Sequence, residues 1–228
     1  MDVDNPLDRA VWNALTTRQA ARAQGGPRAL RMDADYGFFA AAADPSANSM
    51  NALLALGAPG MEMGVVELEP PPAIPGLGVV TQSPIWQMIH DGRRPAGAPG
   101  LEIVPLTEAD APEMLALATL TRPGPFYGRT HQLGDFFGIR IDGRLAAMAG
   151  ERLKVPGHTE VSGVCAHPDF RGRGYAATLM GVVIARILAR GETAFLHAFP
   201  TNSGAIALHE SLGFSLRREF VLTVLAPT

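Results

Sequence analysis

The segment 161–176 combines residue types that suit the binding of a phosphate group. An apolar, β-branched stretch ends near Ala166, the turn Arg171 to Gly174 alternates arginine with glycine, and an apolar run follows. Glycine lets a backbone approach a ligand closely, and the first N–H groups of a helix point at an anion with the positive end of the helix dipole behind them. Arginine adds planar donors that match phosphate oxygens. The segment therefore predicts a strand, a phosphate-binding turn and a helix.

Two common phosphate signatures are absent from this turn. It contains neither the G-x-G-x-x-G fingerprint of dinucleotide sites nor the lysine of a P-loop, since the chain's single lysine, Lys154, precedes it. An ATP-binding protein that uses the turn is an alternative, but no magnesium ligands or phosphate-binding lysine accompany the turn.

Two blocks of sequence resemble the GNAT superfamily of acetyl-CoA-dependent N-acyltransferases. Arg171, Gly174 and Ala176 fill the defined positions of the R/Q-x-x-G-x-G/A signature, and the segment 202–214 is similar to the N-x-x-A-x-x-L-Y-E-x-L-G-F helix found downstream. The best match is the FR47-like branch, which resembles the C-terminal half of glycine N-acyltransferases. The resemblance covers residues 101–228.

The resemblance implies that acetyl-CoA binds as co-substrate. Backbone N–H groups of the turn would hold the pyrophosphate, and the main chain of the preceding strand would pair with pantetheine and direct an N–H at the thioester oxygen. Asn202 would lie near the pantetheine arm, cap the following helix, or do both. The implied cofactor-binding residues are Val164, Cys165, Ala166, Arg171, Gly172, Arg173, Gly174, Tyr175, Ala176 and Asn202. No metal is expected, because the six histidines lack metal-ligand spacing.

Glu160 is the candidate general base. It precedes Arg171 by eleven residues, the position of the base glutamate in histone-type members of the superfamily. An amine must lose a proton to attack a thioester, and alternation along a strand would place Glu160 on the face of Ser162 and Val164. The alternative is a strand-end glutamate in water or paired with an arginine.

His209 occupies the position where the family usually has tyrosine, the acid that protonates the departing CoA thiolate. Imidazole can donate a proton near neutral pH, although it is shorter than a phenol. A helix-surface histidine with no proton role is the alternative.

The acceptor side is expected in the loop from Arg122 to His131, which covers the acceptor cleft in this fold. Phe126 and Tyr127 would supply apolar walls, and Arg129 could bind a carboxylate through two hydrogen bonds. A solvated loop is the alternative. His197, on a later strand, faces either the same cleft or the core.

Composition places the chain among ordinary globular proteins. It has 228 residues, 47% hydrophobic and 18% charged, with a net charge of −3, so no nucleic-acid or membrane partner is expected. One cysteine excludes an internal disulfide framework, and the acidic start at Met1 to Asp4 lacks a secretory signal. We expect a cytoplasmic monomer or homodimer.

The Pro/Gly-rich segment 92–100 predicts a boundary between an N-terminal α/β region, 1–95, and a GNAT domain, 101–228. The domain should follow β-α-β-β-β-α-β-α-β in an α/β (α+β mixed-sheet) fold, with Asp110 and Glu113 as a capping box and a hairpin turn at Asp142–Gly143.

The structure and function of the first hundred residues are harder to infer from sequence. They predict helices over 7–23, 45–56 and 85–90 and strands over 61–68 and 79–82. The region is interpreted as a packing and substrate-lid unit or as a degenerate copy of the acyltransferase half.

The sequence thus predicts an N-acetyltransferase that joins acetyl-CoA and the primary amine of a small, amino-acid-like molecule in a ternary complex. A non-catalytic acyl-CoA sensor remains the alternative.

Overall fold

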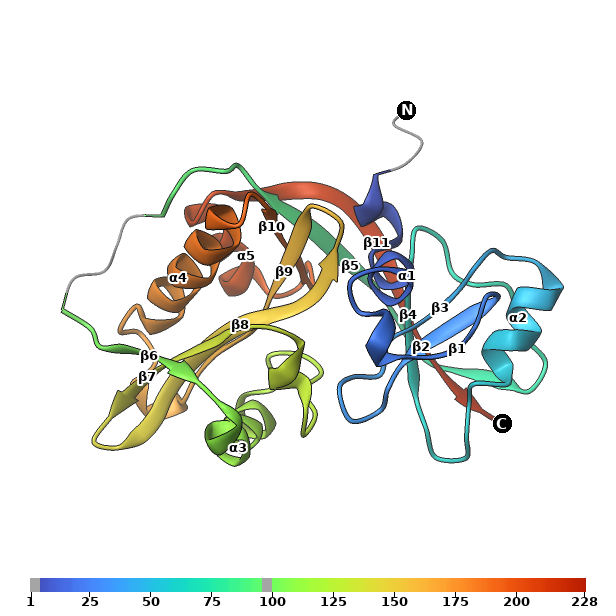
Figure 1. Ribbon diagram of the computed structural model, residues 1–228, viewed down its shortest axis with the longest axis horizontal. Helices are drawn as coiled ribbons and strands as arrows, with labels where there is room; N and C mark the ends of the chain where they lie inside the picture. The colour runs from blue at the N-terminus through green and yellow to red at the C-terminus, as the bar shows by residue number, and fades with distance from the viewer. Residues whose placement is uncertain (1–4, 96–99) are drawn as a thin grey trace.

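The computed structural model describes residues 5–95 and 100–228, in which an eight-stranded mixed sheet joins both halves of the chain (Figure 1). The strand order is β4-β11-β5-β10-β9-β8-β7-β6, and β1, β2 and β3 form a smaller antiparallel sheet. The N-terminal half contains η1 (Pro6–Arg9), α1 (Ala10–Thr16), η2 (Ala20–Arg22), β1 (Ala23–Gly26), β2 (Ala29–Met32), β3 (Ala40–Ala42), α2 (Ala47–Leu54), β4 (Met63–Glu67) and β5 (Leu77–His90).

The C-terminal half has the predicted order of elements, which confirms the expected fold class. Its elements are β6 (Ile103–Leu106), η3 (Glu108–Asp110), α3 (Ala111–Thr121), η4 (Thr130–Leu133), β7 (Phe136–Ile141), β8 (Arg144–Val155), β9 (His158–Ala166), η5 (Pro168–Phe170), α4 (Tyr175–Ala189), β10 (Thr193–Ala198), α5 (Ser203–Ser211) and β11 (Phe214–Pro227). The hairpin turn has positive φ at both Asp142 (50°) and Gly143 (78°), as a type I′ turn requires. The capping box differs from the prediction: Asp110 accepts from the N–H of Thr107 at 2.8 Å, so Thr107 is the N-cap.

Helices cover both faces of the central strands. On α4, Leu179, Val183 and Ile187 are fully buried at four-residue spacing and pack with Ala147 and Ala149 of β8. Met148, between these two alanines, packs instead with Met114 and Leu117 of α3, because neighbouring strand residues face opposite sides. Figure 1 shows α4 and α3 on opposite sides of this part of the sheet. The helix α1 covers the far end of β8, where Leu153 and Val155 are buried.

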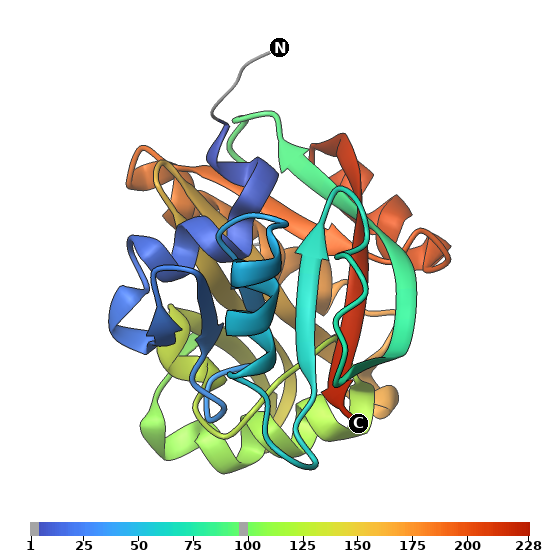
Figure 2. The same ribbon diagram turned by 90° about the vertical axis from the view of Figure 1, so that its right-hand side faces the viewer.

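The N-terminal half departs from the prediction at β5, where a single strand replaces the expected short strand and helix over 79–90. Residues 86–89 hydrogen-bond to β10 on one side and to β11 on the other. This pairing decides the local structure, because a short apolar run is compatible with either a helix or a strand. Figure 2 shows β5 and β11 as long, bent neighbours that carry the sheet towards the N-terminal elements.

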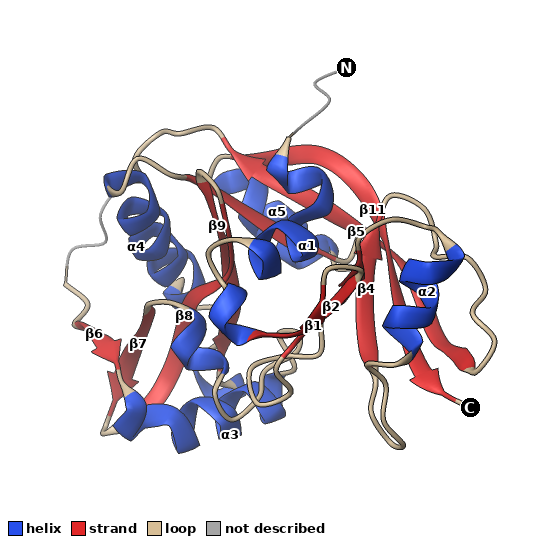
Figure 3. Cartoon of the chain, turned by 45° about the vertical axis from the view of Figure 1, so that its right-hand side comes forward, coloured by secondary structure: helices blue, strands red, loops and turns tan. Residues whose placement is uncertain are grey.

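Elsewhere in this half, α2 and β4 lie inside their predicted ranges, and Ser46 caps α2 by accepting from the N–H of Ser49. The helix expected over 7–23 ends at Thr16, whose hydroxyl donates to the carbonyl of Trp12 at 2.8 Å. The small sheet β1–β3, packed beside α1 in Figure 3, was not predicted. Residues 96–99 of the expected linker lie outside the described residues.

Candidate active site

The strands β9 and β10 separate from each other and open a cavity within the sheet. Their parallel pairing covers Thr193↔His158 to Phe195↔Glu160 and ends there. Beyond that point both strands, residues 161–166 and 196–198, line a cavity of about 410 Å³. A cavity at a break between parallel strands exposes main-chain donors and acceptors to a ligand. The gap therefore suits an extended ligand that lies along a strand.

A β-bulge interrupts β9 at this opening. The register against β8 changes from Gly150↔Ser162 to Met148↔Cys165, so two residues of β9, Gly163 and Val164, face one residue of β8. Gly163 has a φ of +64°, which glycine adopts without strain. The bulge takes one residue out of the ladder and turns its main chain towards the cavity. The alternation that was expected to place Glu160 and Val164 on one face is lost here.

The glycine turn lies where the sequence predicts it, at the start of α4. Gly172 and Gly174 have φ values of +74° and +77°, and the helix begins at Tyr175. Arg171 and Ala176 line the cavity, whereas the Arg173 guanidinium stacks over Phe170 and donates to the Asp169 carbonyl. Glycine adopts such positive φ values without strain. The turn therefore presents backbone without side chains at the positive end of a 15-residue helix.

The helix α5 forms another wall of the cavity. Asn202 caps it by accepting from the N–H of Ala205 at 3.2 Å and also lines the cavity, so both expected contributions are geometrically compatible. His209 lines the same cavity and is 8% exposed, and its buried Nδ1 has no partner among the described residues. Burial lowers the pKa of His209 to about 4. The imidazole is therefore neutral at pH 7, unlike the cationic acid that the sequence suggests.

Glu160 is fully buried and does not line the cavity. Its carboxylate accepts from Nε and Nη2 of Arg152 at 2.9 and 2.8 Å and lies 2.8 Å from Nδ1 of His197. Burial alone would raise the pKa of Glu160, but Arg152 and His197 outweigh it and hold that pKa well below its usual range. Such a carboxylate is a poor proton acceptor. Glu160 thus forms the arginine pair that was the alternative, and a contribution to proton transfer would pass through a residue that does line the cavity.

His197 and Arg152 are the members of this group that line the cavity. Gln87 fixes the tautomer of His197: its Oε1 accepts from Arg217 at 2.9 Å, so its amide nitrogen is the atom 3.2 Å from Nε2 of His197. The proton of His197 then lies on Nδ1 and is donated to Glu160. The open choice for His197 is resolved, because it belongs to the wall of the cavity rather than to the core alone.

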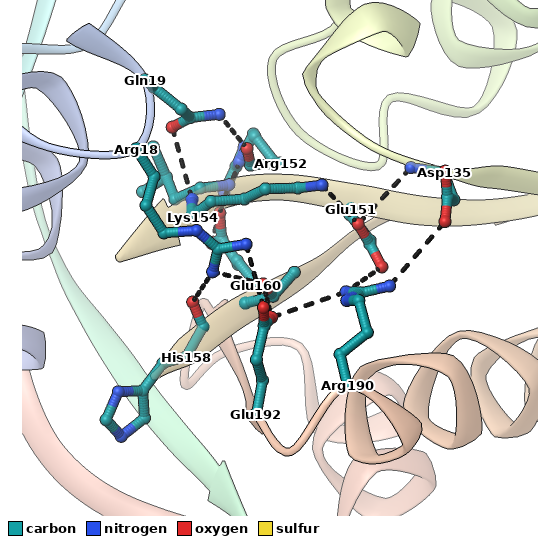
Figure 4. A network of polar contacts seen from close by, with 12 residues as sticks. Arg18, Gln19, Asp135, Glu151, Arg152, Lys154, His158, Glu160, Arg190 and Glu192 are labelled. Atoms are coloured by element: carbon teal, nitrogen blue, oxygen red, sulfur yellow. Dashed lines mark hydrogen bonds and ion pairs between the residues drawn. The ribbon is translucent and has the colours of Figure 1, made fainter. Parts of the chain in front are cut away.

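A network of ion pairs surrounds this group and anchors the N-terminal half to it (Figure 4). Gln19 donates to the Arg152 carbonyl at 2.7 Å, and Arg18 contacts Glu192 at 2.9 Å. The fully buried Glu151 accepts from Arg190 at 2.6 Å and contacts Lys154 at 2.9 Å. Buried charges of this kind are tolerated only when they are paired, so the network fixes β8 and β9 relative to α1 and α4.

The expected acceptor residues lie beside the cavity rather than in its wall. Phe126 packs edge-on against Phe136 at 5.7 Å, Tyr127 lines a separate cavity, and Arg129 stacks over Tyr36 at 4.8 Å. The preceding part of the loop, residues 122–125, lines the main cavity instead. The helix α3 ends one residue earlier, at Thr121, and Arg122 takes a φ of +51°, which directs the chain across the opening.

The N-terminal half supplies cavity residues that sequence reasoning did not identify. They are Phe38, Phe39, Val66 and Ile85. Phe39 also stacks against the Arg152 guanidinium, 4.8 Å from the ring centroid. No motif marks these residues, since their shared position depends on how β4 and β5 join the sheet.

Comparison with known proteins agrees with the site. The family model described as FR47-like protein matches residues 136–222. A GNAT-family structure from Novosphingobium aromaticivorans is 46% identical, with a TM-score of 0.92, over 99% of this chain and 100% of its own. A GCN5-related N-acetyltransferase from Kribbella flavida is 21% identical, with a TM-score of 0.65, over 96% and 95% of the two chains. A search among curated proteins gave no match.

A mixed sheet opened between two parallel strands, with a glycine turn at the mouth of the gap, defines an acyltransferase. The chain belongs to the GNAT family of acetyltransferases. Within residues 5–95 and 100–228, no cluster of histidine, cysteine or acidic side chains could hold a metal ion. The described helices include none that is long and apolar enough to cross a membrane.

Proposed function

We propose that this enzyme transfers the acetyl group of acetyl-CoA to the primary amine of a small, amino-acid-like molecule, with both substrates bound together. The cavity carries this proposal, since it connects the glycine turn at Arg171 and Ala176 with Arg152 and His197 across the gap between β9 and β10. A donor entering from the turn and an amine entering from the other end would meet beside the bulge at Gly163. Holding two reactants in this way removes much of the entropic cost of their encounter.

The residues present fit the donor. Backbone N–H groups from Gly172 to Ala176 would bind the pyrophosphate, with Arg171 at the rim of the cavity. The main chain of the bulge near Val164 would donate to the thioester oxygen as negative charge develops there. Cys165 is buried, and burial raises its pKa to about 11, so it contributes volume rather than a nucleophilic thiolate. The amine therefore attacks the acetyl group directly.

The pair formed by His197 and Glu160 would accept the proton of the amine. His197 lines the cavity, and its Nδ1–H donates to the Glu160 carboxylate at 2.8 Å. Nε2, which lies 3.2 Å from the Gln87 amide nitrogen, is the ring atom that would receive this proton. In this arrangement Glu160 acts through His197.

His209 would assist the departing thiolate as a neutral hydrogen-bond donor. Its low pKa, about 4, leaves little imidazolium to act as an acid at pH 7. A thiolate is stable enough to leave with such modest help.

The charges around the cavity favour an acceptor that carries a carboxylate. Arg122 and Arg152 line the cavity in addition to Arg171 at the donor end, and none of the described lining residues is acidic. Nη2 and Nε of Arg152 are committed to Glu160, while a Cβ placed on Gly124 would lie 3.9 Å from Nη1. Nη1 of Arg152 therefore lies next to the segment 122–125. A carboxylate bound there could contact both Arg122 and Arg152.

Release of thiol from acetyl-CoA across a panel of amines tests the proposal. We expect release that depends on the amine, with glycine preferred over glycinamide because only glycine has a carboxylate. Gly174→Glu is the control that should abolish turnover. Tight binding of acetyl-CoA with no turnover of any amine would contradict the proposal.

A further inference from the structure

A second cavity, of about 470 Å³, lies beside the acceptor end of the active site. Its walls include Met32, Met61, Met63 and Tyr127. Phe38 is the one residue, among those described, that lines both this cavity and the cavity of the active site. The side chain of Phe38 thus stands between the two spaces.

Three stretches of chain continue from one cavity to the other. In the loop before β3, Gly37 lines the second cavity and Phe39 the first. In β4, Met63 lines the second and Val66 the first, and the segment 124–127 passes from the first to the second in the same way. Because each stretch has residues in the wall of one cavity and, within three positions, residues in the wall of the other, the two cavities are neighbours.

The backbone holds the Phe38 ring in that wall. The N–H of Gly64 donates to the Phe38 carbonyl at 2.8 Å, and Phe39 forms a parallel bridge with Gly64. A Cβ placed on Gly64 would lie 2.6 Å from the Phe38 ring, so the ring fills space that only glycine leaves. Its centroid is 5.0 Å from that of Phe39. The ring therefore packs against β4 and against Phe39.

We propose that Phe38 sets the length of the acceptor, because its ring closes the active-site cavity where the second cavity begins. This inference rests on the proposed function and adds a specificity-determining residue to it. The enzyme would select short amines, and removal of the ring would join the two spaces.

The second cavity offers methionine and tyrosine side chains to an apolar chain, and Glu62, the acidic residue among its described lining, is exposed to solvent. Methionine side chains are flexible and adapt to irregular shapes, and Tyr127 adds a half-buried ring. The one arginine in the wall, Arg31, already contacts Met61 Sδ at 2.8 Å and Gln24 at 2.5 Å. A long alkyl tail is therefore the acceptor extension that the joined cavity would hold.

Two amine series test the proposal: straight-chain alkylamines and L-2-aminoalkanoic acids of increasing side-chain length. The readout is the ratio of kcat/KM for a six-carbon chain to that for a two-carbon chain. Phe38→Ala should raise this ratio at least about tenfold over the wild type, since a few extra methylenes in an apolar pocket change specificity by that order. Leu222→Ala is the matched control, because Leu222 lines the active-site cavity but not the second one.

Calorimetry with hexylamine gives a second measurement that needs no turnover. Phe38→Ala should bind hexylamine about tenfold more tightly than wild type, and Leu222→Ala should not. Equal ratios in Phe38→Ala and wild type would overturn the proposal, as would an equal gain in Leu222→Ala. Absence of turnover with every amine would contradict the proposed function, while calorimetry would still decide the role of Phe38. Phe38→Leu, with a smaller expected gain, replaces the alanine variant if that variant does not fold.

Discussion

The proposed donor side and the proposed acceptor side of the active site are built in different ways. The donor side is largely one continuous stretch, residues 161–176, whose contribution is backbone geometry: a bulge, two glycines with positive φ and a helix start. The acceptor side is assembled from side chains of segments far apart in sequence, among them 38–39, 121–125 and 196–199. A site made of local backbone has a sequence signature, whereas one made of distant side chains has none. Four predictions test how far this contrast holds.

The largest effect is expected at the glycine turn. Gly174→Glu forces a bulky residue to a φ of +77° and places a carboxylate where the pyrophosphate of CoA would lie. We expect the heat of CoA binding in calorimetry to vanish, which corresponds to a loss of about 1,000-fold or roughly 4 kcal/mol.

Gly191→Glu is its matched control. Gly191 follows the other end of α4 with a φ of +73°, and a Cβ on either glycine would meet no atom within 4 Å. The control should lose some stability to backbone strain but keep CoA binding. Loss of binding in both variants would show that strain alone explains the effect.

Glu160→Gln should produce the next largest effect, on stability as well as activity. It leaves the buried guanidinium of Arg152 without its ionic partner, which we expect to cost about 3 to 5 kcal/mol in urea unfolding at pH 7. Glu210→Gln, on the surface of α5, serves as control.

The lowered pKa of Glu160 also predicts how the stability of the protein depends on pH. Because the folded-state pKa of Glu160 lies below its unfolded value near 4.5, its contribution is complete above that value and is lost as the pH falls below it. With decreasing pH, the free energy of unfolding of the wild type should therefore fall more steeply than that of Glu160→Gln. Parallel declines would contradict the ion pair.

The contrast between the two sides also explains what the sequence could predict. Gly174 belongs to a segment in which strand, turn and helix follow one another, so the glycine turn and the element order of residues 101–228 were predicted, whereas the bulge at Gly163 was not. The sequence left the pairing of Glu160 with an arginine as one of two alternatives, because Arg152 lies on the neighbouring strand and periodicity does not show which charges meet. The strand β5 was missed for a similar reason, since its pairing with β10 and β11 overrides local preference.

His209 gives the third prediction, again through pH. Burial lowers its pKa to about 4, so the unfolded chain binds an additional proton between about pH 6.5 and 4, and stability must fall as the pH decreases through that window. His209→Phe should remove up to roughly 3 kcal/mol of this decline, as measured by urea unfolding between pH 7 and 4. Its activity between pH 6 and 8 should stay nearly parallel to that of the wild type. A new pH dependence of kcat in this range would instead support proton donation by His209.

The smallest effect distinguishes two arginines of the same loop. From sequence, Arg129 is the residue that would hold a carboxylate, but it lies over Tyr36 and bonds to Gln132 at 3.1 Å, while Arg122 lines the cavity. Arg122→Ala should therefore raise KM for glycine about fivefold, as expected for a partly solvated charge, and leave KM for glycinamide nearly unchanged. Arg129→Ala should change neither by more than about twofold, because its side chain contacts no part of the cavity. Steady-state kinetics with the two acceptors measures both variants. The opposite pattern would show that Arg129 binds the carboxylate of the acceptor. That result would mean that the loop 122–131 moves when the acceptor binds, so that the acceptor side would depend on loop motion while the donor side depends on fixed backbone.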